Sequence, residues 1–202
     1  LSDANNPNRM WVGVSAAGLF RTDDGGKTWA RKNEGIDSDI GQCVHRLTHD
    51  PKNADVIYRQ DHRGVYKSQD AGDTWQRAES GLPIAELSDG HKCSFGFPIV
   101  MDRASHSIFA VPLDGDNFRF PANGRLTVYR SKDGASHWSP QLNGLPETNF
   151  VGILRGAMSA DQKGGVYFGT TSGAVFGTSD LGEHWAELAS GLPRVLSVEA
   201  YT

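Results

Sequence analysis

Charged side chains that could bind a ligand or transfer protons gather in a few irregular segments of this 202-residue chain. The two longest segments are Ile84–Ser94 and Pro112–Arg125, and shorter ones lie at Ile36–Gly41 and Asp61–Arg63. Carboxylates, imidazoles and guanidiniums together can bind a polar ligand or support acid–base catalysis. A single such residue is more often a solvated loop charge, so the set carries more weight than any member. The set is Asp37, Asp39, Asp61, His62, Arg63, Asp89, His91, Lys92, Asp114, Asp116 and Arg119.

No spacing within this set selects a catalytic pair. Hydrolysis of a glycosidic bond needs two carboxyl groups at a defined separation, and the many scattered aspartates do not identify two. His62 and His91 with Asp114 or Asp116 form a weak metal-ligand pattern, because two histidines on separate segments often occur by chance. The sequence therefore assigns no catalytic residue and predicts no metal site and no cofactor.

A repeated eight-residue motif indicates which elements position these side chains. Its frame is Ser/Thr-x-Asp-x-Gly-x-Thr-Trp, and we call each copy an aspartate turn. Ala135 replaces the glycine in the third copy, and His137 and His184 replace the threonine in the last two. Successive tryptophans are 46, 63 and 47 residues apart, a period typical of solenoids and propellers. The four copies are Thr22–Trp29, Ser68–Trp75, Ser131–Trp138 and Thr178–Trp185.

Each aspartate turn is expected to join two short strands as a hairpin. The residues before it alternate between apolar and polar, as Gly64–Lys67 do, and the tryptophan begins the next strand. The aspartate accepts hydrogen bonds from N–H groups of its own turn, and the glycine supplies a positive φ. The indole suits packing between neighbouring sheets. This structural role is assigned to Asp24, Gly26, Trp29, Asp70, Gly72, Trp75, Asp133, Trp138, Asp180, Gly182 and Trp185.

The pattern predicts an all-β protein, a β-propeller of about four blades, each a four-stranded antiparallel sheet with strands a to d from inside to outside. The single domain spans 1–202, with blades at about 1–41, 42–94, 95–148 and 149–193 and a closing strand at 194–202. Strand a is expected at Gln42–Thr48, Phe95–Asp102, Val151–Met158 and Val195–Ala200. Strand b is expected at Met10–Ser15, Val56–Gln60, Ser107–Val111 and Val166–Thr171, strand c before each aspartate turn, and strand d from each tryptophan.

Two arrangements satisfy this order of strands. In one, the last strand joins the first three and closes a four-bladed ring, which removes free sheet edges. In the other, the chain is the C-terminal part of a propeller of six to eight blades. The abrupt start at Leu1, without Met or a signal peptide, and the rarity of four-bladed rings favour the larger parent. Open blade edges would then allow self-association.

The strand order also sorts the loops between two faces. The b–c and d–a loops share one face, and the aspartate turns, as c–d turns, lie on the other. All the irregular segments therefore fall on one face, where loops on a rigid scaffold commonly bind ligands. The candidate ligand-binding residues there are Asp61, His62, Arg63, His91, Asp114, Asp116 and Arg119.

Arg46 and Arg155 are candidates for a different reason. Both fall in expected innermost strands, where a side chain can point into the central channel. A buried charge without a partner is costly, so these guanidiniums either bind an axial anion or bridge to carboxylates of neighbouring blades. The bridge is the more common arrangement.

The repeats resemble the Asp-box, or bacterial neuraminidase repeat (BNR), family. The resemblance covers the whole chain, because Ser/Asn-Gly-Leu-Pro follows three of the four turns, at Ser80–Pro83, Asn143–Pro146 and Ser190–Pro193. Such repeats occur in sialidases, sortilin-type receptors, xyloglucan-cleaving hydrolases and photosystem II assembly factors. The chain is most similar to bacterial glycosyl-hydrolase-like or exo-sialidase-like repeat proteins of unassigned activity. One propeller hosts many chemistries, so the resemblance implies the fold more strongly than the function.

Two functions are consistent with the resemblance. The favoured one is binding of a protein or glycan on the loop-rich face; the alternative is glycoside hydrolysis, exo-sialidase-like or xyloglucanase-like, with catalytic residues on that face or in N-terminal blades outside this chain. Phe118–Pro121 is similar to the Phe/Tyr-Arg-Ile-Pro signature of sialidases, but it follows two aspartate turns where that signature precedes the first, and Phe120 replaces Ile. We therefore expect Arg119 to belong to a folded loop and not to a sialidase site.

Composition excludes several partner classes. The net charge of -4 comes without a basic run, so nucleic acid is not expected, and no apolar stretch is long enough to cross a bilayer. Cys43 and Cys93 form no CxxC pair, and two separate thiols are favoured over one disulfide. The sequence leaves the compartment open.

Overall fold

The computed structural model describes residues 1–36 and 42–201, which form four antiparallel sheets in chain order and one short hairpin. The first sheet contains β1 (Met10–Val14), β2 (Gly18–Thr22) and β3 (Ala30–Arg31). The second contains β4 (Val44–His49), β5 (Ile57–Asp61), β6 (Gly64–Ser68) and β7 (Gln76–Arg77). The third contains β10 (Gly96–Met101), β11 (Ile108–Pro112), β12 (Val128–Ser131) and β13 (Ser139–Gln141). The fourth contains β14 (Met158–Ala160), β15 (Val166–Gly169), β16 (Val175–Thr178) and β17 (Ala186–Ala189).

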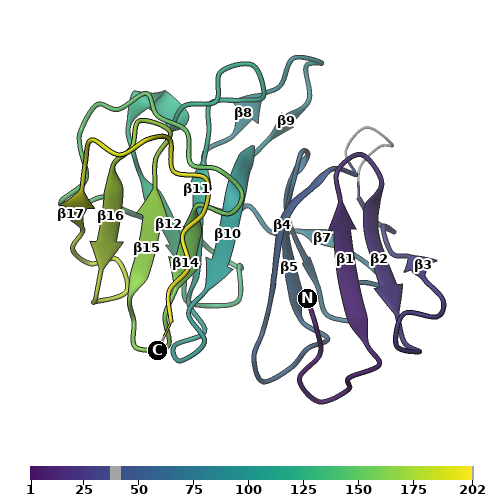
Figure 1. The fold of residues 1–202 in the computed structure, drawn as a ribbon. Coiled ribbons are helices and arrows are strands. Elements are labelled where there is room, and N and C mark those ends of the chain that lie inside the picture. The colour runs from purple at the N-terminus through teal and green to yellow at the C-terminus, as the bar shows by residue number, and fades with distance from the viewer. Residues whose placement is uncertain (37–41, 202) are drawn as a thin grey trace.

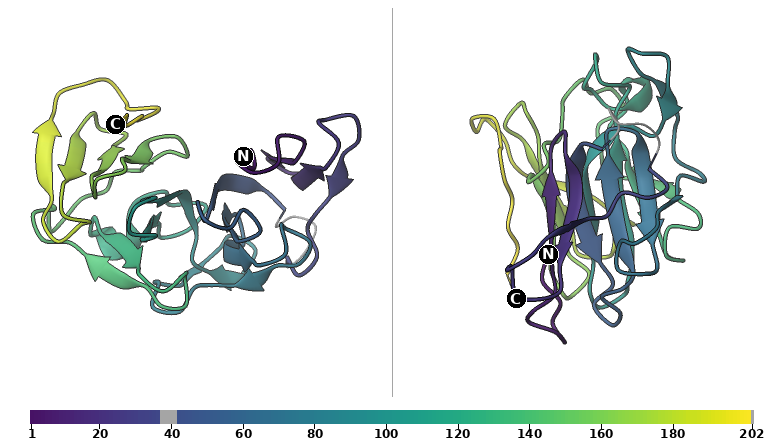
Figure 2. Two further views of the ribbon diagram at one scale, coloured as in Figure 1. Left: turned by 90° about the horizontal axis from the view of Figure 1, so that it is seen from below. Right: turned by 90° about the vertical axis from the view of Figure 1, so that its right-hand side faces the viewer.

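The four sheets fan around an open arc, with the first and last sheets at its two ends (Figure 2). The strands β4, β10 and β14 are neighbours on the inner side of this arc (Figure 1). The hairpin of β8 (Ala85–Glu86) and β9 (Lys92–Cys93) and the single helical turn η1 (Ala122–Gly124) lie in the connections of the second and third sheets. In the described part of the chain, no helix is long and apolar enough to span a membrane.

The core lies between successive sheets. Trp11, Ile57 and Trp75 belong to the cluster between the first two sheets. The second and third sheets enclose a cluster that includes Trp138, and the third and fourth enclose one that includes Trp185. Because β5 and β11 are covered on both faces, all their residues are buried, and a simple alternation of buried and exposed positions does not hold for them.

Each aspartate turn is held by hydrogen bonds to its aspartate. In the first turn, the carboxylate of Asp24 accepts from the amide (2.9 Å) and the hydroxyl (2.6 Å) of Thr28 and from the hydroxyl of Thr22 (2.8 Å). The equivalent amide bond is present in the other three turns at 2.8–3.0 Å. Ala135 takes a positive φ of 65° where the other copies have glycine. The turn therefore keeps its shape without glycine in the third copy, at some cost in backbone strain.

The tryptophan of an aspartate turn also ties its sheet to the preceding one. The backbone N–H of Trp138 donates to the carbonyl of Ser80 at 2.8 Å, and its indole N–H donates to the carbonyl of Ala78 at 2.9 Å. Trp75 makes the same two bonds, to Glu34 and to Lys32, at 2.9 and 3.0 Å. We call this arrangement the tryptophan junction.

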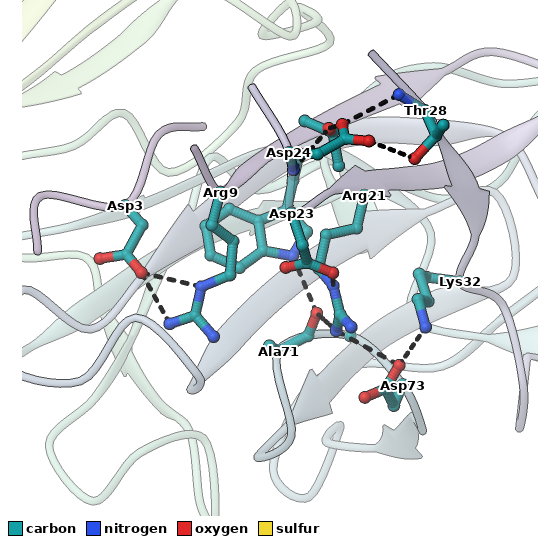
Figure 3. A network of polar contacts seen from close by, with 12 residues as sticks. Asp3, Arg9, Arg21, Asp23, Asp24, Thr28, Lys32, Ala71 and Asp73 are labelled. Carbon is teal, nitrogen blue, oxygen red and sulfur yellow. Dashed lines mark hydrogen bonds and ion pairs between the residues drawn. The ribbon is translucent and has the colours of Figure 1, made fainter. Parts of the chain in front are cut away.

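Further polar contacts cross the boundary between the first two sheets (Figure 3). The indole of Trp11 and the guanidinium of Arg21 both donate to the carbonyl of Ala71, at 2.8 and 3.1 Å. Arg21 and Lys32 of the first sheet also form ion pairs with Asp73, which lies in the second aspartate turn. The second aspartate turn is thus bound to its neighbour by both backbone and charged contacts.

Two tryptophans depart from this pattern. Trp29 is 42% exposed, whereas Trp75, Trp138 and Trp185 are 3%, 1% and 4% exposed. The expectation that each indole packs between sheets therefore fails for Trp29, because no described sheet precedes the first one. Trp185 is buried, but its indole N–H has no hydrogen-bond partner among the described residues.

The strands b and c are close to the expected ranges, but two expected inner strands are not. Val151–Met158 is mostly irregular and only Met158–Ala160 forms β14. The Ala157 N–H turns back to the Leu154 carbonyl at 3.0 Å, and the Gly152 N–H donates to the hydroxyl of the distant Thr171 at 2.9 Å. No strand forms at Val195–Ala200. Instead, Ser197 makes an isolated parallel bridge to Gly156.

The described residues do not form a closed four-bladed ring. The first sheet consists of β1, β2 and β3, the segment 1–3 runs beside β1 with an isolated antiparallel bridge from Ser2 to Met10, and no C-terminal strand joins the sheet. The C-terminal segment bonds to the fourth sheet: the Val198 N–H donates to the Gly156 carbonyl and the Ala200 N–H to the Ser159 hydroxyl, at 2.9 and 3.1 Å. The C-terminal segment therefore lies beside β14 of the fourth sheet and not beside β1 of the first.

Candidate functional site

The b–c connections and the β8–β9 hairpin lie at one end of the sheets, at the top of Figure 1, and the turn from β2 to β3 lies at the bottom. We call the upper end the loop-rich face. It carries the segments 61–63, 84–94, 113–127 and 149–157. Asp37 and Asp39, which the sequence also assigned to this face, lie outside the described residues.

Asp61 is the most buried of the candidate residues and does not face a ligand. Its side chain and that of Arg59 are both fully buried and form an ion pair. The second carboxylate oxygen of Asp61 accepts the Arg63 N–H at 3.0 Å. Burial raises the pKa of Asp61, although the Arg59 guanidinium acts in the opposite direction. Asp61 therefore stabilises the turn between β5 and β6 and is not available to a ligand.

Arg63 holds the β8–β9 hairpin against the second sheet. Its guanidinium bonds both oxygens of Asp89 in the hairpin turn, one of them at 2.9 Å. This fork geometry is the strong form of an arginine–carboxylate pair. The hydrogen bonds from Arg63 lower the pKa of Asp89 well below its usual range. Neither side chain is free for a ligand.

His62 and Asp116 connect the second and third sheets through the same hairpin. Asp116 accepts the amide (2.9 Å) and the hydroxyl (2.6 Å) of Ser88, and its carboxylate lies 3.6 Å from Nε2 of His62. Burial lowers the pKa of His62, while Asp116 opposes that change. Asp116 therefore links the β11–β12 loop to the β8–β9 hairpin, and its carboxylate also lies near the half-buried imidazole of His62.

Beneath these loops the rings of His45, His62, Phe95 and Phe97 form an aromatic cluster, with centroid separations of 4.9–5.9 Å. Nδ1 of His45 lies 2.7 Å from the Gly96 carbonyl. Burial lowers the pKa of His45 to about 3, so its ring is neutral at pH 7. The cluster thus forms an uncharged floor under the loop-rich face.

The remaining loop candidates lie apart from one another. His91 contacts the Arg77 guanidinium at 2.9 Å, and Asp114 is exposed. In the described part of the chain no three His, Cys, Asp or Glu side chains come together as metal ligands. Cys43 and Cys93 are free thiols, and burial raises the pKa of Cys93 to about 12.

The clearest hollow on this face is a pocket of about 420 Å³ between the third and fourth sheets. Arg119 reaches it from the β11–β12 loop, Arg155 from the irregular segment before β14, and Arg194 from the C-terminal segment. We call it the three-arginine pocket. Among the described residues no carboxylate lines it. Its other large side chains are Phe97, Phe150, Leu154 and Leu196.

Two of the arginines share one aromatic ring. The guanidinium carbons of Arg155 and Arg119 lie 5.0 and 5.6 Å from the ring centroid of Phe97, within the range of cation–π contacts. Arg119 also donates from Nε to the carbonyl of Asp116 at 3.2 Å. These contacts hold both side chains at the edge of the pocket.

The pocket wall is a contact between two loops. Phe150 packs against Phe120 with ring centroids 5.3 Å apart. A Cβ added at Gly124 would lie 2.9 Å from the Phe150 ring, and one added at Gly152 would lie 3.1 Å from the Arg119 carbonyl. Glycine at both positions therefore permits the close approach of the b–c loop of the third sheet to the irregular segment before β14.

Arg46 lies in a different cavity from Arg155. It lines a pocket of about 410 Å³ on the inner side of the arc with His49, Arg103, Asp161 and Glu199. Both signs of charge are present there, in contrast to the three-arginine pocket. Arg155 lies in an irregular segment and not in the inner strand that the sequence predicts there. Binding of an axial anion by Arg46 or Arg155 stays a prediction.

Sequence reasoning named Arg119 and Arg155 but missed Arg194, Phe97 and Phe150. Arg194 follows the last Gly-Leu-Pro segment, where a strand was expected next, and Phe97 reads as an ordinary core residue. Only the irregular course of the segments 149–157 and 194–196 brings them together. No local sequence pattern predicts that these two segments are irregular.

No protein-family model matches the chain, and no curated protein matches its sequence. Among solved structures, an ancestral GH74 enzyme superposes with a TM-score of 0.71 at 17% identity, over 95% of this chain and 24% of its own. The GH74 enzyme of Niastella koreensis gives 0.68 at 20% identity, over 94% of this chain and 29% of its own. An extracellular domain from B. thetaiotaomicron gives 0.59 at 13% identity, over 94% and 21%.

At these identities the likeness concerns the fold. The chain spans less than a third of the length of each of these structures. Its strands are antiparallel, its sheets fan about an arc, and the structures that it matches are of propeller type. The described residues therefore have the fold of part of a β-propeller.

Proposed function

We propose that the chain is part of a BNR propeller of six to eight blades that binds a glycan or protein ligand on its loop-rich face and does not hydrolyse it. Three features support the family: the four aspartate turns, the tryptophan junctions and the Gly-Leu-Pro segments that repeat with them. The structural neighbours include enzymes that act on carbohydrates by their GH74 designation, and their likeness supports a glycan-related propeller.

The observation that carries this proposal is the state of the candidate aspartates on the loop-rich face. A glycosidase needs two carboxyl groups facing each other across the bond that is cleaved. Here Asp61 is buried against Arg59, Asp89 is bonded to Arg63, and Asp116 is bonded to Ser88. Only Asp114 is exposed and without a side-chain contact among the described loop aspartates.

Exposed aromatic residues beside the three-arginine pocket supply binding surface. Phe118 and Phe150 are 64% and 67% exposed, and both contact Phe120 across ring centroids 6.1 and 5.3 Å apart. Aromatic rings with one open face stack on sugar rings and on apolar side chains alike. Their place next to a basic pocket makes this part of the face the proposed ligand site.

The test is binding of the full chain to glycan and peptide arrays, alongside assays of fluorogenic glycosides. We expect array binding that is lost in Phe118→Ala and Phe150→Ala and kept in Leu188→Ala, a control at an exposed apolar residue of β17. Glycoside hydrolysis that disappears in Asp114→Asn would contradict the proposal and support the hydrolase alternative. Array binding that is unaffected by both phenylalanine variants would contradict the placement of the ligand site beside the three-arginine pocket.

The exposed Trp29 at the edge of the first sheet supports a second proposal, that open blade edges associate with another copy. Sedimentation of the chain at several concentrations tests it. A monomer over the whole concentration range is the contrary result.

A further inference from the structure

The three arginines of the three-arginine pocket are not neutralised by the protein. Among the described residues none of Arg119, Arg155 and Arg194 forms an ion pair, whereas most other arginines of the loop-rich face and the sheet boundaries do. Among the described residues, the one hydrogen bond of these three guanidiniums is that from Arg119 to the backbone carbonyl of Asp116. Three positive charges from three separate segments of the chain therefore surround one pocket without a carboxylate to neutralise them.

The shared phenylalanine determines how these cations can be used. A guanidinium that lies against an aromatic face keeps its in-plane N–H groups for another partner. Arg119 and Arg155 both contact Phe97, which is itself buried in the aromatic cluster and cannot move away. Two forks with remaining donors at one pocket match the two oxygens of a carboxylate.

The rest of the lining limits what the carboxylate can be attached to. Phe150, Leu154 and Leu196 present apolar surface, and the Thr171 hydroxyl already accepts the Gly152 N–H. A sugar ring carries hydroxyl groups around its edge, and each buried hydroxyl needs a hydrogen-bond partner. This pocket offers few acceptors for them, because no carboxylate or carboxamide side chain lines it in the described part of the chain.

We infer that the three-arginine pocket binds a carboxylate carried by an apolar body, either a free small carboxylic acid or the C-terminus of a polypeptide with an apolar last residue. This inference rests on the proposed ligand-binding face: the polypeptide end specifies the charged contact of a protein ligand, and the free acid is a further ligand class for the same face. A volume of about 420 Å³ lies in the usual range for small-ligand sites. Arg119, Arg155 and Arg194 bind the carboxylate, and Phe150, Leu154 and Leu196 bind the apolar part.

Calorimetric titration of the full chain with three matched six-membered rings tests the inference. Cyclohexanecarboxylate should bind, with an affinity that falls as salt is added. Cyclohexanecarboxamide, which lacks the charge, and glucuronate, which keeps the charge but carries hydroxyl groups, should each bind at least about tenfold more weakly. Equal binding of the amide, tighter binding of glucuronate, or no binding of any of the three overturns the inference.

Variants identify the pocket as the site. Arg119→Gln, Arg155→Gln and Arg194→Gln should each weaken cyclohexanecarboxylate about tenfold or more, the effect of losing one charge-assisted hydrogen bond. Arg125→Gln is the matched control, because Arg125 is exposed on the same loop as Arg119 but does not line the pocket. An equal loss of cyclohexanecarboxylate affinity in Arg125→Gln would show that the effect comes from net charge, and it would contradict the assignment of the site to this pocket.

A second titration separates the two sources of the carboxylate. The tripeptide Gly-Gly-Leu should bind more tightly than cyclohexanecarboxylate if the natural ligand is a polypeptide end, and more weakly if it is a free acid; its C-terminal amide should not bind in either case. An amide that binds as well as the free peptide overturns the inference. An array ligand lost in Phe150→Ala but unchanged in the three arginine variants would overturn this inference and leave the proposed function intact.

Discussion

Replacing Gly81 by alanine should loosen the junction between the second and third sheets. Gly81 has a φ of +91°, and a Cβ there would lie 2.2 Å from the carbonyl oxygen of Trp138 and 2.8 Å from the His137 ring. Contacts this short cannot persist, so either the Gly81 backbone or Trp138 must shift. The shift displaces the hydrogen bond between Trp138 N–H and the Ser80 carbonyl, which is 2.8 Å long.

The expected loss has two parts. An alanine at positive φ costs about 1 kcal/mol or somewhat more, and the weakened backbone bond costs about 1 kcal/mol more. Gly81→Ala should therefore lower the free energy of unfolding by about 2–3 kcal/mol, a large share of the stability of a typical domain. The repeated glycine has this role at Gly35 and Gly144 as well, where an added Cβ would meet the carbonyl oxygens of Trp75 and Trp185 at 2.3 and 2.0 Å.

The chain contains its own control. Gly191 occupies the same place in the last Ser-Gly-Leu-Pro segment and also has a positive φ, of +71°, but no described atom lies within 4 Å of an added Cβ. Gly191→Ala should therefore cost only the backbone strain, about 1 kcal/mol. Urea unfolding of both variants measures the difference. Equal losses in G81A and G191A would refute the idea that the glycine is selected by the next sheet's tryptophan.

Three further outcomes are expected. Asp61→Asn should lower the free energy of unfolding by about 3–5 kcal/mol because it leaves the buried Arg59 charge without its partner; the double variant Arg59→Met with Asp61→Leu should lose less, and a larger loss in the double variant would contradict this. Hydrogen bonds from Thr28 and from Thr178 lower the pKa of Asp24 and of Asp180 to about 2. The stability that these carboxylates contribute is therefore complete above about pH 4 and should disappear as the pH falls through about 2. Thermal unfolding of wild type and Asp180→Asn at pH 5, 3 and 2 measures this contribution, and a difference between the two proteins that is unchanged at pH 2 would refute the prediction. Asp89→Ala should free the β8–β9 hairpin from the second sheet, seen as faster amide exchange in residues 84–94 with little change elsewhere, and unchanged exchange would show that Ser88 and Asp116 suffice.

The sequence is most informative where the chain repeats itself. The strands on either side of each aspartate turn, such as Gly64–Ser68, are where alternation and the tryptophan spacing predict them. Strand d begins just after each tryptophan and not at it; the N–H groups of Trp75, Trp138 and Trp185 bond to the neighbouring sheet instead. Repetition constrains local structure well because each copy must solve the same packing problem.

Prediction fails where the chain leaves the repeat. Val151–Met158 has the composition of an inner strand, but its glycines allow turns and bonds to Thr171 that a strand would exclude. Asp61 looked like a loop charge and is a buried ion-pair partner, because its neighbour two residues earlier is a buried arginine on the same side of β5. The burial of β5 on both faces depends on its packing between neighbouring sheets, which a single sequence does not show.

The tryptophan junctions are made by backbone atoms, one indole and one glycine, and none of these lies in the long connections 84–94 or 113–127. Rewriting the exposed parts of those connections thus leaves the tryptophan junctions in place, while Asp89 and Asp116 provide separate contacts between the second and third sheets. The loop side chains at the proposed ligand site, such as Arg119 and Phe150, can therefore be substituted without removing a hydrogen bond of a tryptophan junction. The separation of scaffold from recognition in this chain is therefore a property of where its hydrogen bonds are made.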